Sequence, residues 1–265
     1  MRVWSLASGS SGNAYLLEAD GCQVLVECGL PLPTLEAALG ALGSSPGRLS
    51  AALVTHDHGD HLRGARPLAD AYSVPIYASA GTLAHPSLEG CARLRELRVG
   101  EARRIGELEV RPFRVPHDGA EPLAFRIEAQ GASVAIVTDL GYVPESLLPC
   151  LQDLDLLILE ANHDPEMLWA GPYHPRLKRR IAGDLGHLSN TAAGQTVAAC
   201  GDRAPRQLWL AHLSTVNNSP ARAVEQVSAV LRARGLGWLK PRALPRAGKP
   251  FGWASRPAAQ QLPLF

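Results

Sequence analysis

The chain has 265 residues, of which 46% are hydrophobic and 19% charged, and its formal net charge at pH 7 is +1. This composition predicts a globular protein with a sizeable core and excludes attraction to nucleic acids or membranes through overall charge alone. No apolar run approaches the length of a transmembrane helix, and a predicted strand follows the first two residues directly. We therefore expect no signal peptide, no membrane association and a cytoplasmic location. The five cysteines form no Cys-X-X-Cys pair and are expected to be buried and reduced.

The beginning of the chain is predicted to be β-structure. A strand at 3–6 leads into a Gly/Ser loop at 7–13, and two strands at 14–19 and 22–28 are joined by Asp20-Gly21, a typical hairpin turn. The loop offers amides and hydroxyls to an anion, with Ser10 and Asn13 as the candidate phosphate-binding side chains, although it lacks the lysine of a nucleotide-binding loop. A simple tight turn is the alternative.

An apolar run at 51–54 leads into Thr55-His56-Asp57-His58-Gly59-Asp60-His61, which places four strong metal-binding side chains within six residues. On an extended segment, residues two apart point the same way, so His56 and His58 can hold one ion together. Asp60 and His61 follow Gly59 and turn toward a second position. A structural zinc finger would instead use cysteines and widely spaced pairs. The segment predicts parts of two metal sites, where a strand ends and a helix at 62–71 begins.

Reactive side chains recur where later predicted strands end. These strands, at 108–115, 132–137, 154–159 and 207–211, are followed by His117, Asp139, Glu160 and His212. Each residue alone could cap a neighbouring element, but their recurrence at strand ends points to a common site. Glu27 closes the strand at 22–28. A buried carboxylate is costly unless it bonds a partner, so Glu27 is expected to orient a metal-binding histidine from behind.

Helices are predicted at 35–42, 166–170, 176–182, 191–200 and 221–233. The one at 176–182 is rich in basic residues. Gly186-His187-Leu188-Ser189-Asn190 precedes the next helix and is a natural phosphate seat, because a helix N-terminus offers free amide groups. A last strand is expected at 236–239, followed by a mobile Pro/Ala/Arg-rich tail. We therefore expect one domain over 1–240, built as two packed sheets flanked by helices, and a tail over 241–265.

These motifs resemble the metallo-β-lactamase-fold hydrolases. The segment at 55–61 is the signature of that family, and His117, Asp139 and His212 follow in the family's order. The segments 8–13, 160–164, 178–180, 186–190 and 211–214 are similar to the bacterial YycJ (WalJ) nuclease subfamily, and two of them also resemble RNase Z. The resemblance covers about residues 6–214. It implies an α/β fold, a four-layer αββα sandwich, with divalent metals and phosphodiester cleavage.

Carried over residue by residue, the resemblance implies two divalent metal ions per chain. The first would be bound by His56, His58 and His117, the second by Asp60, His61 and His212, with Asp139 bridging both. Imidazole and carboxylate ligands suit Zn or Mn, and Fe as well. The departure from the family pattern is Glu27, where the family usually has Asp. The chain also lacks the large inserted domain of RNase J and CPSF-type nucleases and the long arm of many RNase Z enzymes.

The resulting hypothesis is a metal-dependent 5′-to-3′ DNA exonuclease acting in DNA repair on the 5′ ends of duplex or single strands; RNA as substrate and endonuclease action stay open. Asp60 would orient the attacking water, and His187, oriented by Glu160, would protonate the leaving oxygen or bond a phosphate oxygen. Phosphate or backbone contacts are expected from Ser10, Asn13, Arg176, Lys178, Arg180, Ser189 and Ser214. His163 would either stand behind the metal site or form a turn.

Three alternatives remain from the sequence. A small-ester or thioester hydrolase of the glyoxalase II or lactonase type shares the same signature. A β-lactamase usually has a different residue where His61 stands. A non-catalytic nucleic-acid-binding scaffold would be expected to have lost metal ligands, whereas every expected ligand is present here.

Overall fold

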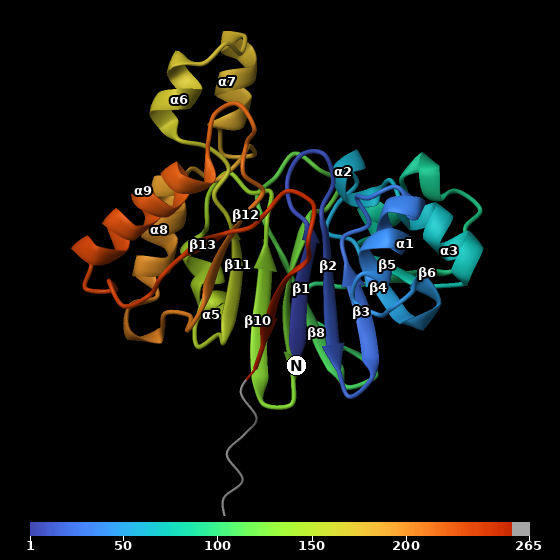
Figure 1. The fold of residues 1–265 in the computed structure, drawn as a ribbon. Helices are drawn as coiled ribbons and strands as arrows, with labels where there is room; N and C mark the ends of the chain where they lie inside the picture. The colour runs from blue at the N-terminus through green and yellow to red at the C-terminus, as the bar shows by residue number, and fades with distance from the viewer. Residues whose placement is uncertain (256–265) are drawn as a thin grey trace, which may run out of the picture.

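The computed structural model describes residues 1–255. Over this range the strands form two seven-stranded mixed sheets that pack face to face, with helices on the outer face of each (Figure 1). The predicted αββα sandwich is confirmed. Part of the predicted tail, residues 256–265, lies outside the described residues.

The first sheet has the strand order β14-β1-β2-β3-β4-β5-β6. Its strands are β1 (Arg2–Ala7), β2 (Ala14–Ala19), β3 (Cys22–Val26), β4 (Leu49–Leu53), β5 (Ile76–Ala78), β6 (Leu94–Glu96) and β14 (Phe251–Ala254). The second sheet has the order β13-β12-β11-β10-β9-β8-β7. Its strands are β7 (Arg103–Ile105), β8 (Leu108–Arg114), β9 (Leu123–Ala129), β10 (Ala132–Val137), β11 (Leu156–Glu160), β12 (Leu208–Ala211) and β13 (Arg242–Ala243).

The helices fall into two outer layers and one protruding pair. They are α1 (Leu32–Gly40), α2 (Gly59–Leu62), α3 (Ala65–Tyr72), α4 (Ala80–Leu83), α5 (Leu148–Leu151), α6 (Pro165–Ala170), α7 (Pro175–Ile181), α8 (Asn190–Ala199) and α9 (Pro220–Ala233). Helices α1 and α3 cover the first sheet, α8 and α9 cover the second, and α6 and α7 rise above one edge of the sandwich (Figure 1). None of the helices in residues 1–255 is long and apolar enough to cross a bilayer.

The two faces of each sheet are buried against different layers. Leu17, Phe125 and Trp209 pack in the core between the sheets. Leu16, one residue from Leu17 and on the opposite face of β2, packs with the helices of the first outer layer. Strands buried on both faces need near-continuous apolar sequence, and β10, β11 and β12 have it.

Parallel pairing decides where the site lies. Strands β10, β11 and β12 run parallel, so their carboxyl ends meet at one edge of the second sheet. Strands β3 and β4 are parallel in the first sheet and end at the same side of the sandwich. This common edge lies below α6 and α7 in Figure 1. The residues that follow these strands are therefore brought together.

Three predicted elements are corrected by the structure. The helix expected at 62–71 is divided into α2 and α3 at Gly64, where a Cβ would lie 2.3 Å from the Leu30 carbonyl oxygen. The strand expected at 236–239 is wrong, because these residues form a turn after α9. The tail does not begin at 241: β13 pairs with β12 and β14 pairs with β1, so residues 242–254 contribute an edge strand to each sheet.

Candidate metal centre

The predicted metal-binding residues come together at the common edge of the two sheets. The loop after β4 carries His56 and His58, and α2 carries Asp60 and His61. The remaining three follow β8, β10 and β12: His117, Asp139 and His212. Each of the seven belongs to at least one group of residues whose ligand atoms lie within 4.8 Å of one another.

The first cluster consists of His56, His58 and His117. The Nε2 atom of His117 lies 3.3 Å from Nδ1 of His58. Nδ1 of His117 donates to the Gly186 carbonyl oxygen at 3.0 Å, which leaves Nε2 as the nitrogen with a free lone pair. Nδ1 of His56 lies 2.8 Å from the Thr55 hydroxyl, and its buried Nε2 has no hydrogen-bond partner. These contacts to Gly186 and Thr55 therefore fix two of the three rings of this cluster, those of His117 and His56.

The second cluster consists of Asp60, His61 and His212. Oδ2 of Asp60 lies 3.3 Å from Nε2 of His212 and 3.5 Å from Nε2 of His61. Asp139 lies between the two clusters, with Oδ2 3.1 Å from Nε2 of His61 and Oδ1 4.0 Å from Nε2 of His117. This is the placement expected of a carboxylate shared by both clusters.

The buried charges of the site are mutually stabilising. Burial alone would raise the pKa of the Asp139 carboxyl, but the His212 and His61 imidazoles outweigh burial and hold that pKa well below its ordinary value. Burial would lower the pKa of His61, whereas the carboxylates of Asp139 and Glu27 raise it well above its ordinary value. Asp139 is therefore ionised, as a metal-binding carboxylate must be.

This donor set fits a divalent cation. Imidazole nitrogens and carboxylate oxygens are the ligands that Zn, Mn and Fe share. The buried Nε2 atom of His56 has no hydrogen-bond partner, a costly arrangement that coordination of an ion would remove. Asp60 remains partly open to solvent, with 19% of its side chain exposed, so a substrate can approach the site.

Glu27 lies behind the second cluster, as predicted for it. It is fully buried, and Oε2 lies 3.3 Å from Nδ1 of His61, on the ring edge opposite the one that faces Asp139. Glu27, Asp139 and His212 have φ angles of 71°, 60° and 53°. Residues other than glycine rarely adopt this left-handed backbone region, and such strain is typical of functional sites.

Glu160 connects the site to His187. Its Oε1 atom accepts from Nδ1 of His187 at 2.9 Å and from Nδ1 of His212 at 2.8 Å. Its Oε2 atom accepts from the backbone amides of Leu140 and Leu188 at 3.1 and 3.0 Å. Burial would raise the pKa of this carboxyl, but His187 and the hydrogen bonds hold it below its ordinary value. Glu160 is thus positioned from four directions.

The predicted phosphate-binding residues do not converge in the same way. Ser10 is exposed on its loop, whereas the side chain of Asn13 is buried and its Nδ2 lies 3.1 Å from Nε2 of His61. Ser189 caps α8 by accepting from the Ala192 amide at 3.2 Å, and Ser214 accepts from the Asn217 amide at 3.1 Å.

Two of the three predicted basic side chains have internal partners, whereas Arg176 is exposed, and His163 is held through its backbone. Lys178 donates to the Trp169 carbonyl oxygen at 2.7 Å, and Arg180 donates to Asp118 at 2.7 Å. His163 is buried beside Ser189: its carbonyl oxygen accepts from the Asn190 amide at 2.9 Å, and its Nδ1 has no hydrogen-bond partner.

Sequence reasoning missed three supporting residues. Thr55 holds the His56 ring, and Asp118 lies 3.5 Å from Nε2 of both His58 and His117. The Ser8 hydroxyl accepts from the His212 amide at 2.9 Å. Thr55 and Asp118 adjoin the ligands in sequence, which is a usable signal. Ser8 is 204 residues from His212, so no local pattern could have revealed it.

Two packed mixed sheets with histidines and aspartates gathered at one edge define a metal-dependent hydrolase. A family model described as a beta-lactamase superfamily domain matches residues 23–213, so the chain belongs to that superfamily, and its fold is the metallo-β-lactamase fold. Together with the clusters, this membership indicates that the chain binds divalent metal.

The chain is also similar to a particular group within this class. It is 36% identical over 236 residues to exodeoxyribonuclease YycJ of Bacillus anthracis, covering 88% of this chain and 89% of that protein. Among solved structures, the metallo-β-lactamase-fold protein YhfI from Bacillus subtilis has a TM-score of 0.72 at 19% identity, covering 96% of this chain and 99% of that one. Human tRNase Z, short form, has a TM-score of 0.61 at 20% identity, covering 81% and 93%.

Proposed function

We propose that this chain is a metal-dependent phosphodiesterase that removes nucleotides from the 5′ ends of DNA. The observation that carries the proposal is the convergence of all seven expected metal ligands beside the Glu160–His187 pair. The DNA substrate and the exonuclease action are proposed from the 36% identity, over 88% of the chain, to a protein named as an exodeoxyribonuclease. The 5′-to-3′ direction is the one that the sequence motifs imply through their resemblance to YycJ-type nucleases. Resection from a 5′ end is a step that DNA repair requires, so the proposal includes a role in repair.

Two divalent ions would be held by the residues described above. His56, His58 and His117 would bind one, Asp60, His61 and His212 the other, and Asp139 both. Zn and Mn are the favoured candidates, with Fe a third. Such a pair supplies a hydrolytic nucleophile at neutral pH and polarises the phosphoryl group, so no side chain has to attack the phosphorus.

His187 is suited to proton donation. Its Nδ1 donates to Glu160, which leaves Nε2 as the second ring nitrogen, and 22% of its side chain is exposed. Burial would lower the pKa of His187, but the carboxylates of Glu160 and Asp139 raise it above its ordinary value. An imidazolium held in this way can protonate the leaving oxygen of the cleaved ester. Asp60, partly open to solvent, would accept a hydrogen bond from the attacking water.

Two other activities need the same site and differ in substrate. RNA cleavage is the nearer alternative, because the fold is also that of human tRNase Z. A small-ester or thioester hydrolase is the second alternative, since it would use the same metal-binding signature. A nucleic-acid-binding scaffold without activity would not need metal.

The test is hydrolysis of one DNA strand labelled separately at its 5′ and 3′ ends, with RNA of the same sequence and a thioester as comparators and with Mn and Zn compared. We expect mononucleotides released from the 5′ end and little turnover of the thioester. Faster cleavage of RNA, or internal cleavage of a circular strand, would contradict the proposal. Fewer than one bound ion per chain, with no turnover, would favour the scaffold. A mutation-rate assay in a strain lacking the gene tests the role in repair.

A further inference from the structure

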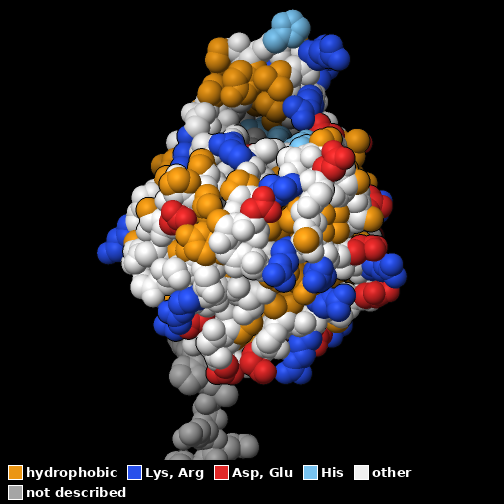
Figure 2. Space-filling view, turned by 90° about the vertical axis from the view of Figure 1, so that its right-hand side faces the viewer, with side chains coloured by type: hydrophobic (Ala, Val, Ile, Leu, Met, Phe, Trp, Pro, Cys, Tyr) orange, Lys and Arg blue, Asp and Glu red, His pale blue; other side chains and the backbone are white. Residues whose placement is uncertain are grey.

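Helices α6 and α7 form a protrusion, residues 165–181, that stands above the candidate metal centre (Figure 1). Figure 2 shows hydrophobic side chains gathered on this protrusion, basic side chains beside them, and a hollow beneath it in which histidines are visible. None of the metal ligands lies on the protrusion, and the hydrolytic chemistry does not require it. Its surface therefore needs a separate explanation.

The protrusion is attached to three loops that carry site residues. Arg180 at the end of α7 donates to Asp118, next to His117, at 2.7 Å. The His187 amide donates to the Ile181 carbonyl oxygen at 2.8 Å. The Asp164 amide donates to the carbonyl oxygen of Asn217, in the loop after His212, at 2.9 Å. The protrusion is thus held in a fixed place relative to the site.

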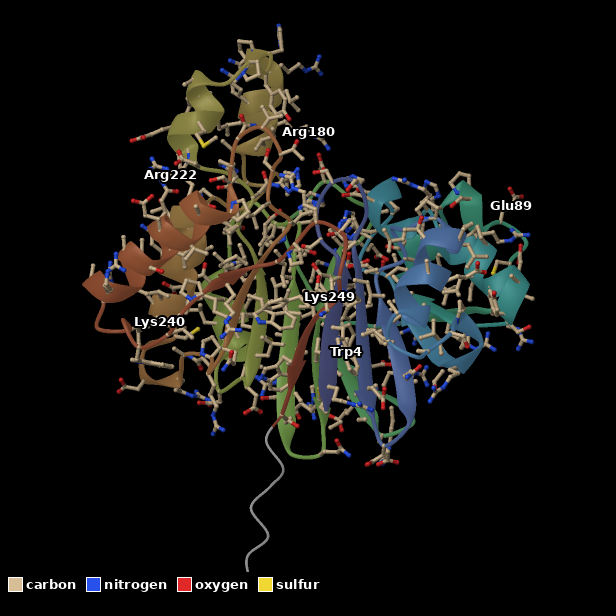
Figure 3. The ribbon with its side chains drawn as sticks, viewed as in Figure 1. Trp4, Glu89, Arg180, Arg222, Lys240 and Lys249 are labelled. Atoms are coloured by element: carbon tan, nitrogen blue, oxygen red, sulfur yellow. The ribbon has the colours of Figure 1, made fainter. Side chains whose placement is uncertain are left out.

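Its base is also tied to the outer helix layer. The Asp164 side chain caps α6 by accepting from the Met167 amide at 3.1 Å, and it accepts from Arg222 and Gln226 of α9. Arg222 and Arg180 lie on opposite sides of the base of the protrusion (Figure 3). A surface mounted in this way can present side chains to a bound ligand without first being ordered.

Exposed apolar side chains are concentrated around this site. Eight large hydrophobic side chains are exposed among the described residues. Five of them lie on the protrusion or in loops next to site residues: Tyr142, Trp169, Leu177, Leu185 and Val216. Trp169 is the largest of the five and is 53% exposed. Exposed apolar side chains on the segments that flank a polar centre indicate a ligand with flat apolar surfaces attached to a charged group.

The charges of the protrusion point to the same kind of ligand. Between 165 and 181 there are four basic residues and a single acidic one, Glu166. Lys178 and Arg180 have internal partners, but Arg176 and Arg179 are exposed, and no carboxylate of residues 1–255 pairs with either. Lys178 donates to the carbonyl oxygen of Trp169 itself, so α7 fixes the position of that residue.

We propose that Trp169 stacks on an unpaired base of the strand that is being cleaved, while Arg176 and Arg179 contact the phosphates of the same strand. This inference rests on the proposed nuclease function and deepens it, because it assigns single-stranded DNA next to the scissile phosphate. Bases inside a duplex are covered by their neighbours, whereas an exposed aromatic ring beside exposed arginines suits an unpaired strand of any sequence.

The test combines a protein variant with a substrate variant. Cleavage of a single-stranded oligodeoxynucleotide is compared with that of a small phosphodiester, bis(p-nitrophenyl) phosphate, using the metal-loaded protein. In Trp169→Ala, we expect the ratio of kcat/KM for the oligonucleotide to that for the small ester to fall about ten-fold, mainly through KM. Trp169→Phe should restore most of the ratio. Trp238→Ala is the matched control, because Trp238 is 57% exposed and lies outside the protrusion, in the turn after α9. Lys240, two residues further along the chain, is labelled far from the protrusion in Figure 3.

A single abasic nucleotide, placed in turn at each of the first several positions of the strand, locates the stacked base. At one position the abasic nucleotide should lower kcat/KM of the wild-type protein by a similar factor of about ten. At that position it should not lower kcat/KM of Trp169→Ala any further. An unchanged ratio in Trp169→Ala, or additive losses at every abasic position, would overturn the inference while leaving nuclease activity established. Absence of nuclease activity in the wild-type protein would instead refute the proposed function.

Discussion

The Oε1 atom of Glu160 lies 2.9 Å from Nδ1 of His187, and it also lies 2.8 Å from Nδ1 of His212. One fully buried carboxylate oxygen therefore holds both the proposed proton donor and a proposed metal ligand. A substitution of Glu160 is therefore expected to affect both proton donation by His187 and metal binding by His212. A substitution of His187 is expected to affect proton donation alone.

Replacing His187 with Ala is expected to lower kcat by roughly 100- to 10,000-fold, the usual contribution of a general acid, with both metals retained. Glu160→Gln should lower kcat and also weaken metal binding, since it loosens His212 as well. Metal analysis of the purified variants, together with their kinetics, separates the two effects. Loss of a metal in His187→Ala would mean that His187 is itself a ligand.

Asp139 lies between the two clusters, so Asp139→Ala should lower metal occupancy at both and abolish measurable turnover. Bound metal stabilises the charge of the transition state by several kcal/mol, so its loss should lower the rate at least about 1000-fold. The check is the metal content per chain by elemental analysis, beside the rate. Full activity of this variant, or two ions still bound to it, would refute the bridging role.

Glu27→Gln removes the charge behind His61 while keeping the shape of the side chain. Because Oε2 of Glu27 lies 3.3 Å from Nδ1 of His61, we expect one of the two metals to bind roughly 10- to 100-fold more weakly. Competition with a chelating dye measures the two affinities. Glu18→Gln is the control, since Glu18 on β2 pairs with Arg2 of β1, away from the site. Equal affinities in the wild type and Glu27→Gln would show that Glu27 has no such role.

His163 is expected to make stability depend on pH. Burial lowers its pKa to about 4, below the value of about 6.5 that it has in the unfolded chain. Between these values the unfolded state binds more protons, so stability falls as pH decreases from about 6.5 to 4 and is unaffected by this group above that range. At pH 5 the loss is roughly 2 kcal/mol.

In His163→Leu this contribution should vanish, so the free energy of unfolding should decrease less between pH 7 and pH 5 than in the wild type. Urea denaturation of both chelated proteins at the two pH values measures the difference. The same decrease in both proteins would show that His163 is not the group responsible.

Chelation should lower the melting temperature. A ligand that binds only the folded state at 100 times its Kd contributes about 2.7 kcal/mol, which for a chain of this size corresponds to roughly 5–10 °C. Thermal denaturation with and without a chelator, followed by re-addition of Mn or Zn, measures the shift. In Asp139→Ala the chelator should have little further effect, and a shift as large as in the wild type would count against these residues as the metal site.

The local sequence pattern predicted some features of the protruding helices α6 and α7 and not others. Its basic residues were apparent from the sequence, and both α6 and α7 lie within one residue of their predicted bounds. Which of those charges are free was not apparent, because Arg180 pairs with Asp118, 62 residues away. The sequence pattern did not single out Trp169, because its exposure on the protrusion depends on how α6 and α7 attach to the rest of the fold.

The sequence by itself determined which residues are the candidate metal ligands, because the ligand types, the spacing of residues 56–61 and the strand-end positions of His117, Asp139 and His212 are local features. The tertiary structure decided how they meet and what supports them: Ser8 behind His212, Glu160 between two histidines, and β14 alongside β1. The physical reason is that pairing between distant segments is selected by the packing of the whole core. Propensity and periodicity report only on neighbours in the chain.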